Sequence, residues 1–215
     1  MNRITLKDAK EIKLMNRIDK KYVIDFDQFC SLSSFIYDNF YIVENDGIIM
    51  LPYFSLYFDT PNMDMHKDHL NKKTHRQKIR IREYSAGEKY LEIKEKNNSE
   101  FTKKKRIPVQ SYILNEETNW IDENLIYDTK NLNKKLEVRF NRLTLVSLDK
   151  QSRITIDFNI RFHNYMTDKS IKIKHIIVEV KKKTQELIPF EKELQKMKIE
   201  SQGFSKYSIG LLLTK

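Results

Sequence analysis

The sequence predicts an α+β protein whose antiparallel strands close into a barrel with flanking helices. The first observation is a set of short segments that alternate apolar and charged residues, of which Lys78-Ile79-Arg80-Ile81-Arg82 is the clearest. A period of two places the isoleucines on one face of a strand and the cations on the other. The second observation is that helically patterned segments stand between the strands. If the charged faces point inward, the sheet must close around a polar bore, with helices covering its apolar outer face.

The first part of the chain predicts two strands and two helices. Strands are expected at residues 17–24 and 53–58. A helix is expected at residues 27–40, because apolar residues recur there at helical spacing and Asp27 can serve as its N-cap. The Thr-Pro pair at residues 60–61 predicts the start of a second helix, with the threonine as its cap and the proline at its first position.

The remainder of the chain predicts further strands and three more helices. Four strands joined by hairpins are expected between residues 78 and 109, with turns at Gly87 and at residues 97–99. The other expected strands are 136–148, 152–160 and 175–182, and the other expected helices are 112–127, 189–197 and 205–213.

The composition indicates one globular domain over residues 1–215 with a strong positive charge. Forty Lys and Arg residues against 30 Asp and Glu residues give a formal net charge of +10, which favours anionic partners such as phosphates, nucleic acid or an anionic membrane surface. The single cysteine, Cys30, excludes an internal disulfide and fits a reducing compartment. The N-terminus is too charged for a signal peptide, and no apolar run reaches the ~20 residues of a membrane helix, so a cytoplasmic protein without a membrane span is expected.

The charged strand faces together form a mainly basic surface. By parity its members are Arg17, Asp19, Lys21, Lys78, Arg80, Arg82, Glu92, Lys94, Lys96, Lys104, Arg106, Glu137, Arg139, Arg153, Asp157, Glu179 and Lys181. Arg142 joins them if a bulge shifts the register after Arg139. Such a surface suits phosphate oxygens together with one divalent cation held by carboxylates. The alternative for any one strand is a solvated face with interstrand ion pairs.

A second line of inference comes from motifs that follow in order from about residue 17 to residue 210. They are Arg17-Ile18-Asp19-Lys20-Lys21-Tyr22, Tyr57-Phe58-Asp59-Thr60-Pro61, Lys78-Ile79-Arg80-Ile81-Arg82, Leu91-Glu92-Ile93-Lys94-Glu95-Lys96, Ser152-Arg153-Ile154-Thr155-Ile156-Asp157, Val178-Glu179-Val180-Lys181 and Ser205-Lys206-Tyr207-Ser208-Ile209-Gly210. This ordered set resembles the VTC domain of the triphosphate tunnel metalloenzymes, relatives of the CYTH phosphatases. The resemblance implies a closed eight-stranded antiparallel β-barrel, a tunnel that binds triphosphate or polyphosphate.

The resemblance also assigns roles by position. The implied basic catalytic residues are Lys21, Arg80, Arg82, Lys94, Arg142, Arg153 and Lys206. Glu179 corresponds to the metal-binding glutamate, with Glu137 or Glu92 as further ligands of Mn²⁺ or Mg²⁺. Lys104, or a neighbour in the basic run 103–106, matches a lysine after the hairpin. Asp19 and Arg17 depart from the acidic motif of the CYTH relatives, which argues against a metal site on the first strand.

Other residues are expected to contact the substrate. On the charged faces these are Lys78, Lys96, Lys104, Arg106, Arg139 and Lys181. Ser205 reads as an N-cap that places Lys206 in the first turn of a helix, where a cation opposes the helix dipole unless an anion binds there. His69 falls where VTC sequences often carry histidine, although a surface helix is the alternative for this segment.

The expected function is that of a metal-dependent polyphosphate polymerase, which the VTC resemblance implies. Such an enzyme transfers the terminal phosphate of ATP to a growing polyphosphate chain. Two alternatives stay open: a triphosphatase that hydrolyses inorganic triphosphate or a nucleoside triphosphate, and a non-catalytic polyphosphate-binding module. Nucleic acid is not favoured as a partner, because the cations lie on strand faces rather than beside exposed aromatic residues.

Overall fold

The computed structural model describes residues 2–12, 18–85, 87–97, 102–114 and 117–215, which form two compact units. Unit 1 comprises Met1–Pro52, Phe140–Ile160 and Lys172–Phe204, and unit 2 comprises Tyr53–Arg139, Arg161–Ile171 and Ser205–Lys215. Arg17 and residues 98–99, which were assigned to a strand and to a turn, lie outside the described residues. One domain over residues 1–215 stays a prediction.

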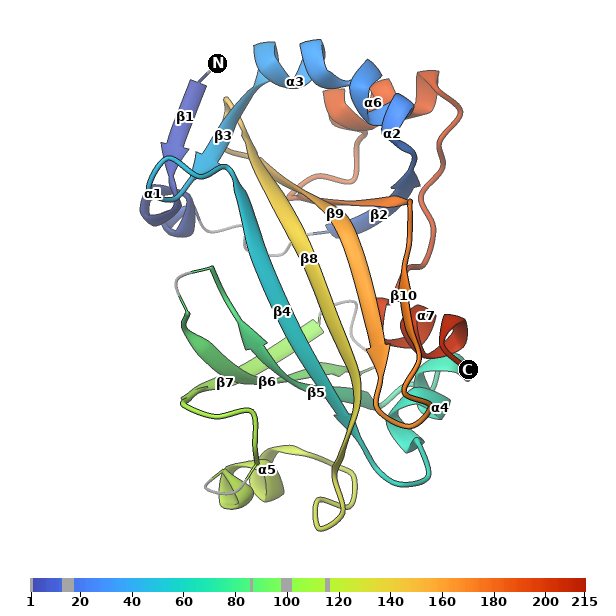
Figure 1. The fold of residues 1–215 in the computed structure, drawn as a ribbon. Helices are drawn as coiled ribbons and strands as arrows, with labels where there is room; N and C mark the ends of the chain where they lie inside the picture. Colours follow the sequence, from blue (N-terminus) through green and yellow to red (C-terminus); the bar gives the residue numbers. More distant parts are fainter. Residues whose placement is uncertain (1, 13–17, 86, 98–101, 115–116) are drawn as a thin grey trace. The chain divides into compact units, whose positions relative to one another are not determined.

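Helices and strands alternate irregularly along the chain, as Figure 1 shows. In chain order they are β1 (Asn2–Thr5), α1 (Leu6–Glu11), β2 (Ile18–Ile24), α2 (Phe26–Ser31), α3 (Ser33–Asn39), β3 (Phe40–Glu44), β4 (Met50–Asp59), α4 (Asp64–Leu70), β5 (Arg76–Glu83), β6 (Lys89–Lys96), β7 (Thr102–Val109), α5 (Thr118–Asn124), β8 (Asn133–Ser147), β9 (Ser152–Asn164), β10 (Ser170–Lys172), β11 (Ile176–Lys182), α6 (Pro189–Lys196) and α7 (Lys206–Leu213). This mixture confirms the α+β class.

The sheet is open, and the predicted closed barrel is wrong. Its main path is β2-β11-β9-β8-β4-β5-β6-β7, so the expected eight strands are present, and β1, β3 and β10 extend it to 11 strands. Closure needs a ladder between β2 and β7, and the described residues contain none. β7 is the strand at one end of the path, and its run of four cations at residues 103–106 is the kind of charge that protects an edge strand from further pairing. Pro108 in β7 also lacks the backbone donor that a ladder requires.

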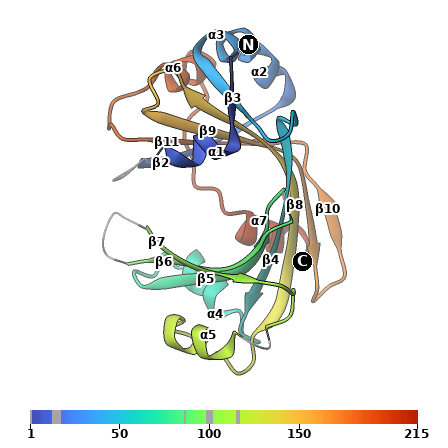
Figure 2. The ribbon, with the colours of Figure 1, turned by 90° about the vertical axis from the view of Figure 1, so that its left-hand side faces the viewer.

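In unit 1, helices cover one face of the sheet. Ile154 and Ile156 of β9 and Val178 of β11 are fully buried and pack in one core with residues of α3 and α6, among them Phe190. Figure 2 shows α2, α3 and α6 together on one side of β9, β11 and β2. The period of two therefore leaves the odd-numbered residues of β9 and β11 on the other face.

Unit 2 repeats this arrangement around β4 to β7. Ile79, Ile81 and Leu91 are fully buried and form a core with residues of α4 and α5, including Met65 and Ile121. Figure 2 shows α4 and α5 on the same side of β5, β6 and β7. Helical cover of the apolar strand faces is thus found in each unit, and the even-numbered residues of β5 to β7 lie on the uncovered face of this core.

The local predictions fail mainly at helix starts. The helix expected at residues 27–40 begins one residue earlier, at Phe26, because Asp25 is the N-cap of α2 and forms a capping box with Gln28. The helix is also divided in two: α2 ends before Leu32, and α3 begins after it. The second helix, α4, begins at Asp64 rather than at residues 60–61. The carboxylate of Asp59 accepts hydrogen bonds from the amides of Met65 and His66, which fixes that later start.

Other differences concern the number of elements. Residues 78–109 contain three strands instead of four, and the helix expected at 112–127 is limited to α5. The sequence pattern did not identify β1, α1, β3 and β10 as separate elements. Among the described residues, no helix is long and apolar enough to cross a membrane.

Candidate functional site

The uncovered face of β5, β6 and β7 in unit 2 gathers several of the predicted cations. Lys94 is paired in register with Lys78 on one side and with Lys104 on the other, and Glu92 is likewise paired with Arg80 and Arg106. Neighbouring strands are about 4.8 Å apart. We call this group the β5–β7 cluster; its members are Lys78, Arg80, Arg82, Glu92, Lys94, Lys104 and Arg106.

The carboxylate of Glu92 is the centre of the β5–β7 cluster. It is 1% exposed, and its Oε2 accepts from Nε and Nη2 of Arg80 at 3.0 and 2.7 Å. Its Oε1 lies 2.5 Å from Nζ of Lys104 and accepts from the Tyr84 hydroxyl at 2.9 Å. Burial alone would raise the pKa of Glu92, but Arg80, Arg82 and Lys104 hold it well below its ordinary value. Both oxygens are therefore fully used as a fixed counterion.

Lys104 responds to the same surroundings in the opposite direction. Burial lowers the pKa of Lys104 to about 8, although the Glu92 carboxylate acts to raise it, and the charges of Arg80 and Arg82 lower it further. An ammonium group with this pKa loses its charge close to neutral pH.

A buried chain of contacts holds Arg80 from behind. Its Nη1 donates to the Tyr57 hydroxyl at 3.0 Å, and the Tyr57 ring is stacked on that of Tyr207, with centroids 5.0 Å apart. The Tyr207 hydroxyl donates at 2.7 Å to Asp59, which is fully buried. Burial would raise the pKa of Tyr57, but Arg80, Arg82 and Lys206 lower it overall. Asp59, which accepts from the amides of Met65 and His66 in α4, is thus linked to the guanidinium of Arg80.

The start of α7 is hydrogen-bonded to the β5–β7 cluster. Ser205 is the N-cap, because its side chain accepts from the amide of Ser208, as the sequence predicts. Its Oγ also accepts from Nζ of Lys78 at 2.8 Å, and Lys206 is the first residue of the helix. Nε of Arg82 in β5 donates at 3.1 Å to the hydroxyl of Ser55, which lies on the neighbouring strand β4.

Unit 1 contains a second group of charged residues on the uncovered face of β2, β9 and β11. Glu179 is paired in register with Lys21 on one side and Thr155 on the other. Lys181 is likewise paired with Asp19 and Arg153. We call this group the β11 cluster; its members are Asp19, Lys21, Arg142, Arg153, Thr155, Asp157, Glu179 and Lys181.

Glu179 lies among three cations. Its Oε2 is 2.5 Å from Nζ of Lys181, and this is the one hydrogen bond of its carboxylate within the described part of the chain. Burial would raise the pKa of Glu179, but Lys181, Lys21 and Arg142 lower it well below its ordinary value. The carboxylate is therefore ionised and has an oxygen available for a further partner.

Arg142 enters the β11 cluster through a shift in β8. Buried and less buried residues alternate along β8 from Leu136 to Phe140. Asn141 and Arg142 then follow as two partly exposed residues, and Leu143 is buried again. Its guanidinium makes a two-pronged ion pair with Asp157, at 2.6 and 2.9 Å. Asp157 is 1% exposed, so this is a buried charge pair with good geometry.

Lys21 and Arg153 of the β11 cluster donate to backbone carbonyls. Nζ of Lys21 donates to the carbonyl of Phe204 at 2.6 Å. Arg153 Nη2 donates to the carbonyl of Ile12 at 3.1 Å and to that of Ala9. Thr155 is 4% exposed, and its hydroxyl has no hydrogen-bond partner among the described residues. A buried hydroxyl of this kind needs an explanation, for which a bound ligand oxygen is one.

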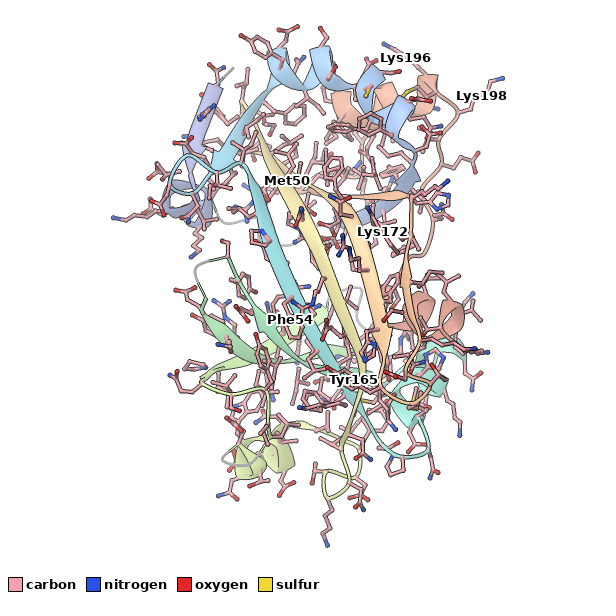
Figure 3. The ribbon with its side chains drawn as sticks, in the orientation of Figure 1. Met50, Phe54, Tyr165, Lys172, Lys196 and Lys198 are labelled. Carbon is pink, nitrogen blue, oxygen red and sulfur yellow. The ribbon has the colours of Figure 1, made fainter. Side chains whose placement is uncertain are left out.

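Several predicted site residues lie apart from these groups. Arg139 is exposed and pairs with Glu137. The guanidinium carbon of Arg139 lies 4.8 Å from the centroid of the Phe54 ring. The Tyr165 hydroxyl donates to Glu137 at 3.2 Å (Phe54 and Tyr165 are labelled in Figure 3). Lys96 is the exposed last residue of β6, and His69 lies in the last turn of α4.

Part of the positive charge also lies away from strand faces. Figure 3 shows Lys196 and Lys198 projecting from the end of α6, and both are exposed.

A metal ion would have few protein ligands here. Within residues 2–12, 18–85, 87–97, 102–114 and 117–215, no three His, Cys, Asp or Glu side chains are grouped closely enough to hold one. Glu92 has both oxygens occupied, and Glu137 is bonded to Arg139 and Tyr165. Of these three glutamates, Glu179 is the one with a carboxylate oxygen that has no hydrogen bond within the described residues. One such carboxylate suits an ion whose other ligands are substrate phosphates and water, which is the usual arrangement for Mg²⁺.

Several residues in or beside these clusters received no role from sequence reasoning, among them Tyr57, Asp59, Tyr207 and Thr155. Tyr57 and Asp59 belong to a motif that was recognised, and Tyr207 belongs to another, but no role followed from either motif. Thr155 shares the parity of Arg153 and Asp157, so alternation along β9 could have placed it on the charged face.

Comparisons with known proteins identify a family and similar folds. The family model of the VTC domain matches residues 16–215, which confirms the resemblance. A Bacillus halodurans protein described as a candidate adenylate cyclase is 14% identical, with a TM-score of 0.58 over 89% of this chain and 96% of that chain. HpAC1 from Hippeastrum, a candidate adenylyl cyclase described as having a dominant triphosphatase activity, is 14% identical, with a TM-score of 0.56 over 93% and 97%. These two show a shared fold alone. No curated protein matches the sequence.

Proposed function

Because the chain belongs to the VTC domain family, we propose that it is a polyphosphate polymerase that transfers the terminal phosphate of ATP to a growing polyphosphate chain. The observation that carries this proposal is the β5–β7 cluster, in which Lys78, Arg80 and Arg82 occupy every second position of one strand. With a rise of about 3.3 Å per residue, successive cations are about 7 Å apart. A linear polyanion along the strand meets them one after another, and the guanidinium groups bind phosphate oxygens in pairs.

The transfer needs positioning more than proton chemistry. An oxygen of the acceptor phosphate attacks the γ-phosphorus of ATP, the bond to the β–γ bridging oxygen breaks, and ADP leaves. The attacking oxygen is already anionic, so no base has to remove a proton. Arg80 is held by Glu92 and Tyr57, and Arg82 by Ser55, so both point in fixed directions before the charge of the transition state develops.

A divalent ion, Mn²⁺ or Mg²⁺, would be held by Glu179 in this proposal. When bound, such an ion would supply positive charge that neutralises part of the charge of phosphate oxygens. Lys181 and Lys21 keep the carboxylate ionised by lowering its pKa, and the Thr155 hydroxyl beside it can donate to a phosphate oxygen. The resemblance to triphosphate tunnel metalloenzymes supports the use of such an ion.

Triphosphate hydrolysis is the second candidate. It is favoured by one specific likeness, since HpAC1 shares the fold and is described as having a dominant triphosphatase activity. In that case water takes the place of the acceptor phosphate, and the same cations neutralise the triphosphate. Inorganic triphosphate or a nucleoside triphosphate would then be the substrate, and a non-catalytic polyphosphate-binding module remains the third candidate.

One incubation separates the candidates. The protein is incubated with ATP and Mn²⁺ or Mg²⁺, the products are separated by length on a gel, and free phosphate is measured in parallel. Long chains together with ADP support the polymerase, free phosphate without chains supports the triphosphatase, and binding without turnover supports the binding module. Glu179→Gln serves as the negative control, and chains of wild-type yield from that variant would contradict the proposed site.

A further inference from the structure

One end of the β5–β7 cluster carries three tyrosines. Tyr84 directly follows β5 and continues its charged face, and Tyr90 of β6 is paired in register with Arg82. Tyr53 lies on the neighbouring strand β4. The ring centroids of Tyr53 and Tyr84 are 5.5 Å apart, and those of Tyr84 and Tyr90 are 5.8 Å apart, both in edge-to-face geometry. All three residues are half-buried.

Two arginines are stacked on these tyrosines. The guanidinium carbon of Arg106 lies 4.6 Å from the centroid of the Tyr90 ring, and that of Arg82 lies 5.8 Å from the centroid of the Tyr53 ring. Arg106 is exposed, so the outer plane of its guanidinium is accessible. The hydroxyl of Tyr84 is fixed by Glu92 at 2.9 Å. The result is a preordered surface of flat, electron-rich and cationic groups.

The tyrosines are not needed by the hydrophobic core of unit 2. That core uses other aromatic residues, among them Phe54, Tyr112 and Trp120, on the face that α4 and α5 cover. Tyr112 also makes a cation–π contact, because Nζ of Lys89 lies 5.3 Å from the centroid of its ring. The three tyrosines lie on the charged face instead, where an aromatic ring gains from a flat ligand rather than from core packing.

We propose that Tyr53, Tyr84, Tyr90 and Arg106 bind the base of a nucleoside triphosphate whose phosphates lie against Arg80 and Arg82. This rests on the proposed function of the β5–β7 cluster and adds to it a binding site for the base of the nucleotide donor. Tyr84 is about 7 Å beyond Arg82 along the strand direction, and Tyr90 is the cross-strand neighbour of Arg82. Bases stack on tyrosine rings and on guanidinium planes with little dependence on base identity.

The test compares two ligands that differ in the nucleoside. ATP and inorganic tripolyphosphate are titrated calorimetrically into the wild-type protein and into Tyr90→Leu. The Kd for ATP is expected to rise about tenfold in this variant, as for loss of one base–aromatic stack, while the Kd for tripolyphosphate stays unchanged. Tyr112→Leu is the matched control, because it removes a tyrosine with a stacked lysine from the opposite face, and neither Kd should change.

The outcomes separate this inference from the proposed function. If Tyr90→Leu weakens both ligands equally, or neither, the base site is refuted and the phosphate clamp stands. If the wild-type protein does not bind tripolyphosphate, the phosphate clamp itself is wrong, and the base site is refuted with it. Tripolyphosphate binding in the same sample shows that the variant is folded. If Tyr90→Leu does not fold, Tyr53→Leu is measured in its place with the same expected ratio.

Discussion

The β5–β7 cluster and the β11 cluster use the same residue types, but they distribute negative charge differently. In the β5–β7 cluster one buried carboxylate, Glu92, accepts bonds on both oxygens from Arg80, Lys104 and Tyr84. In the β11 cluster the negative charge is divided. Asp157 is occupied by Arg142, while Glu179 is bonded through one oxygen.

The difference indicates a division of tasks. A fully satisfied counterion fixes the directions of the arginines around it and leaves no coordination for an ion, so the β5–β7 cluster is suited to binding. Within the described residues, Glu179 has one oxygen without a hydrogen bond and the buried Thr155 hydroxyl has no partner, so this cluster is suited to a substrate and an ion that complete the bonding.

The largest effect is expected for Glu179→Gln in the β11 cluster. Its turnover should fall by on the order of 10²–10³-fold, the range for removing one group that stabilises transition-state charge. Folding should be largely preserved, because Glu179 lies among cations rather than in the core. The measurement is ATP turnover at saturating Mn²⁺ together with a thermal melt.

Glu193→Gln is the matched control for that change. Glu193 also lies in unit 1 and pairs with a lysine, Lys196, at 2.7 Å, but on the surface of α6. This variant should keep wild-type turnover. Wild-type turnover in Glu179→Gln as well would remove Glu179 from the mechanism and leave the two clusters without a functional difference.

The second effect is expected for Arg80→Ala in the β5–β7 cluster. Binding of tripolyphosphate should weaken by about 1.5–3 kcal/mol, as for hydrogen bonds to a charged group. Relief of repulsion between cations would stabilise the free protein, but Arg80 also neutralises the buried Glu92 carboxylate, so stability should fall. Calorimetric titration and an unliganded melt measure both quantities.

A double variant separates the two roles of Arg80. Adding Glu92→Gln to Arg80→Ala removes the uncompensated buried charge, so part of the lost stability should return while the affinity for tripolyphosphate stays low. Recovery of affinity in the double variant would mean that Arg80 only neutralises Glu92, and that the β5–β7 cluster is a solvated face.

A smaller effect is expected for Thr155→Val, with stability rising and phosphate affinity falling. Loss of a buried hydroxyl without a partner should raise the free energy of unfolding, while tripolyphosphate affinity falls by about 0.5–1.5 kcal/mol, the worth of one hydrogen bond. Thr214→Val provides the contrast, because the Thr214 hydroxyl donates to the carbonyl of Gly210 at 2.7 Å. That variant should lose stability and keep its affinity. Unchanged affinity in Thr155→Val would exclude Thr155 from phosphate binding.

The smallest effect is a pH dependence that belongs to Lys104. Burial lowers the pKa of Lys104 to about 8, so its positive charge is present below that pH and lost above it. Phosphate binding favours the charged form, and the affinity for tripolyphosphate should fall about two- to fivefold as pH rises through this value, as for one exposed ion pair. Lys104→Arg stays charged and should show a flatter profile. Identical profiles for both proteins would assign the titration to another group.

The faces of the strands could be predicted from the sequence, because side-chain direction repeats every two residues. Alternation placed Arg80 and Arg82 together, and Glu179 with Lys181, without knowledge of any partner strand. The N-cap at Ser205 and the α+β class followed equally from local patterns. The ordered motifs added the VTC family, which the match over residues 16–215 confirms.

Partners could not be predicted, because they depend on register between segments far apart in the chain. Asp59 and Tyr207 are 148 residues apart, yet they are hydrogen-bonded to each other. Asp59 also accepts from an amide at the start of α4, and Tyr207 stacks on Tyr57, which holds Arg80. The same holds for the ends of the sheet: alternation specifies the two faces of β2 and β7 but not whether these strands pair. Local periodicity thus determined which residues share the charged faces of the strands. Tertiary structure alone decided that Glu92 is a counterion and that one oxygen of Glu179 has no hydrogen bond within the described part of the chain.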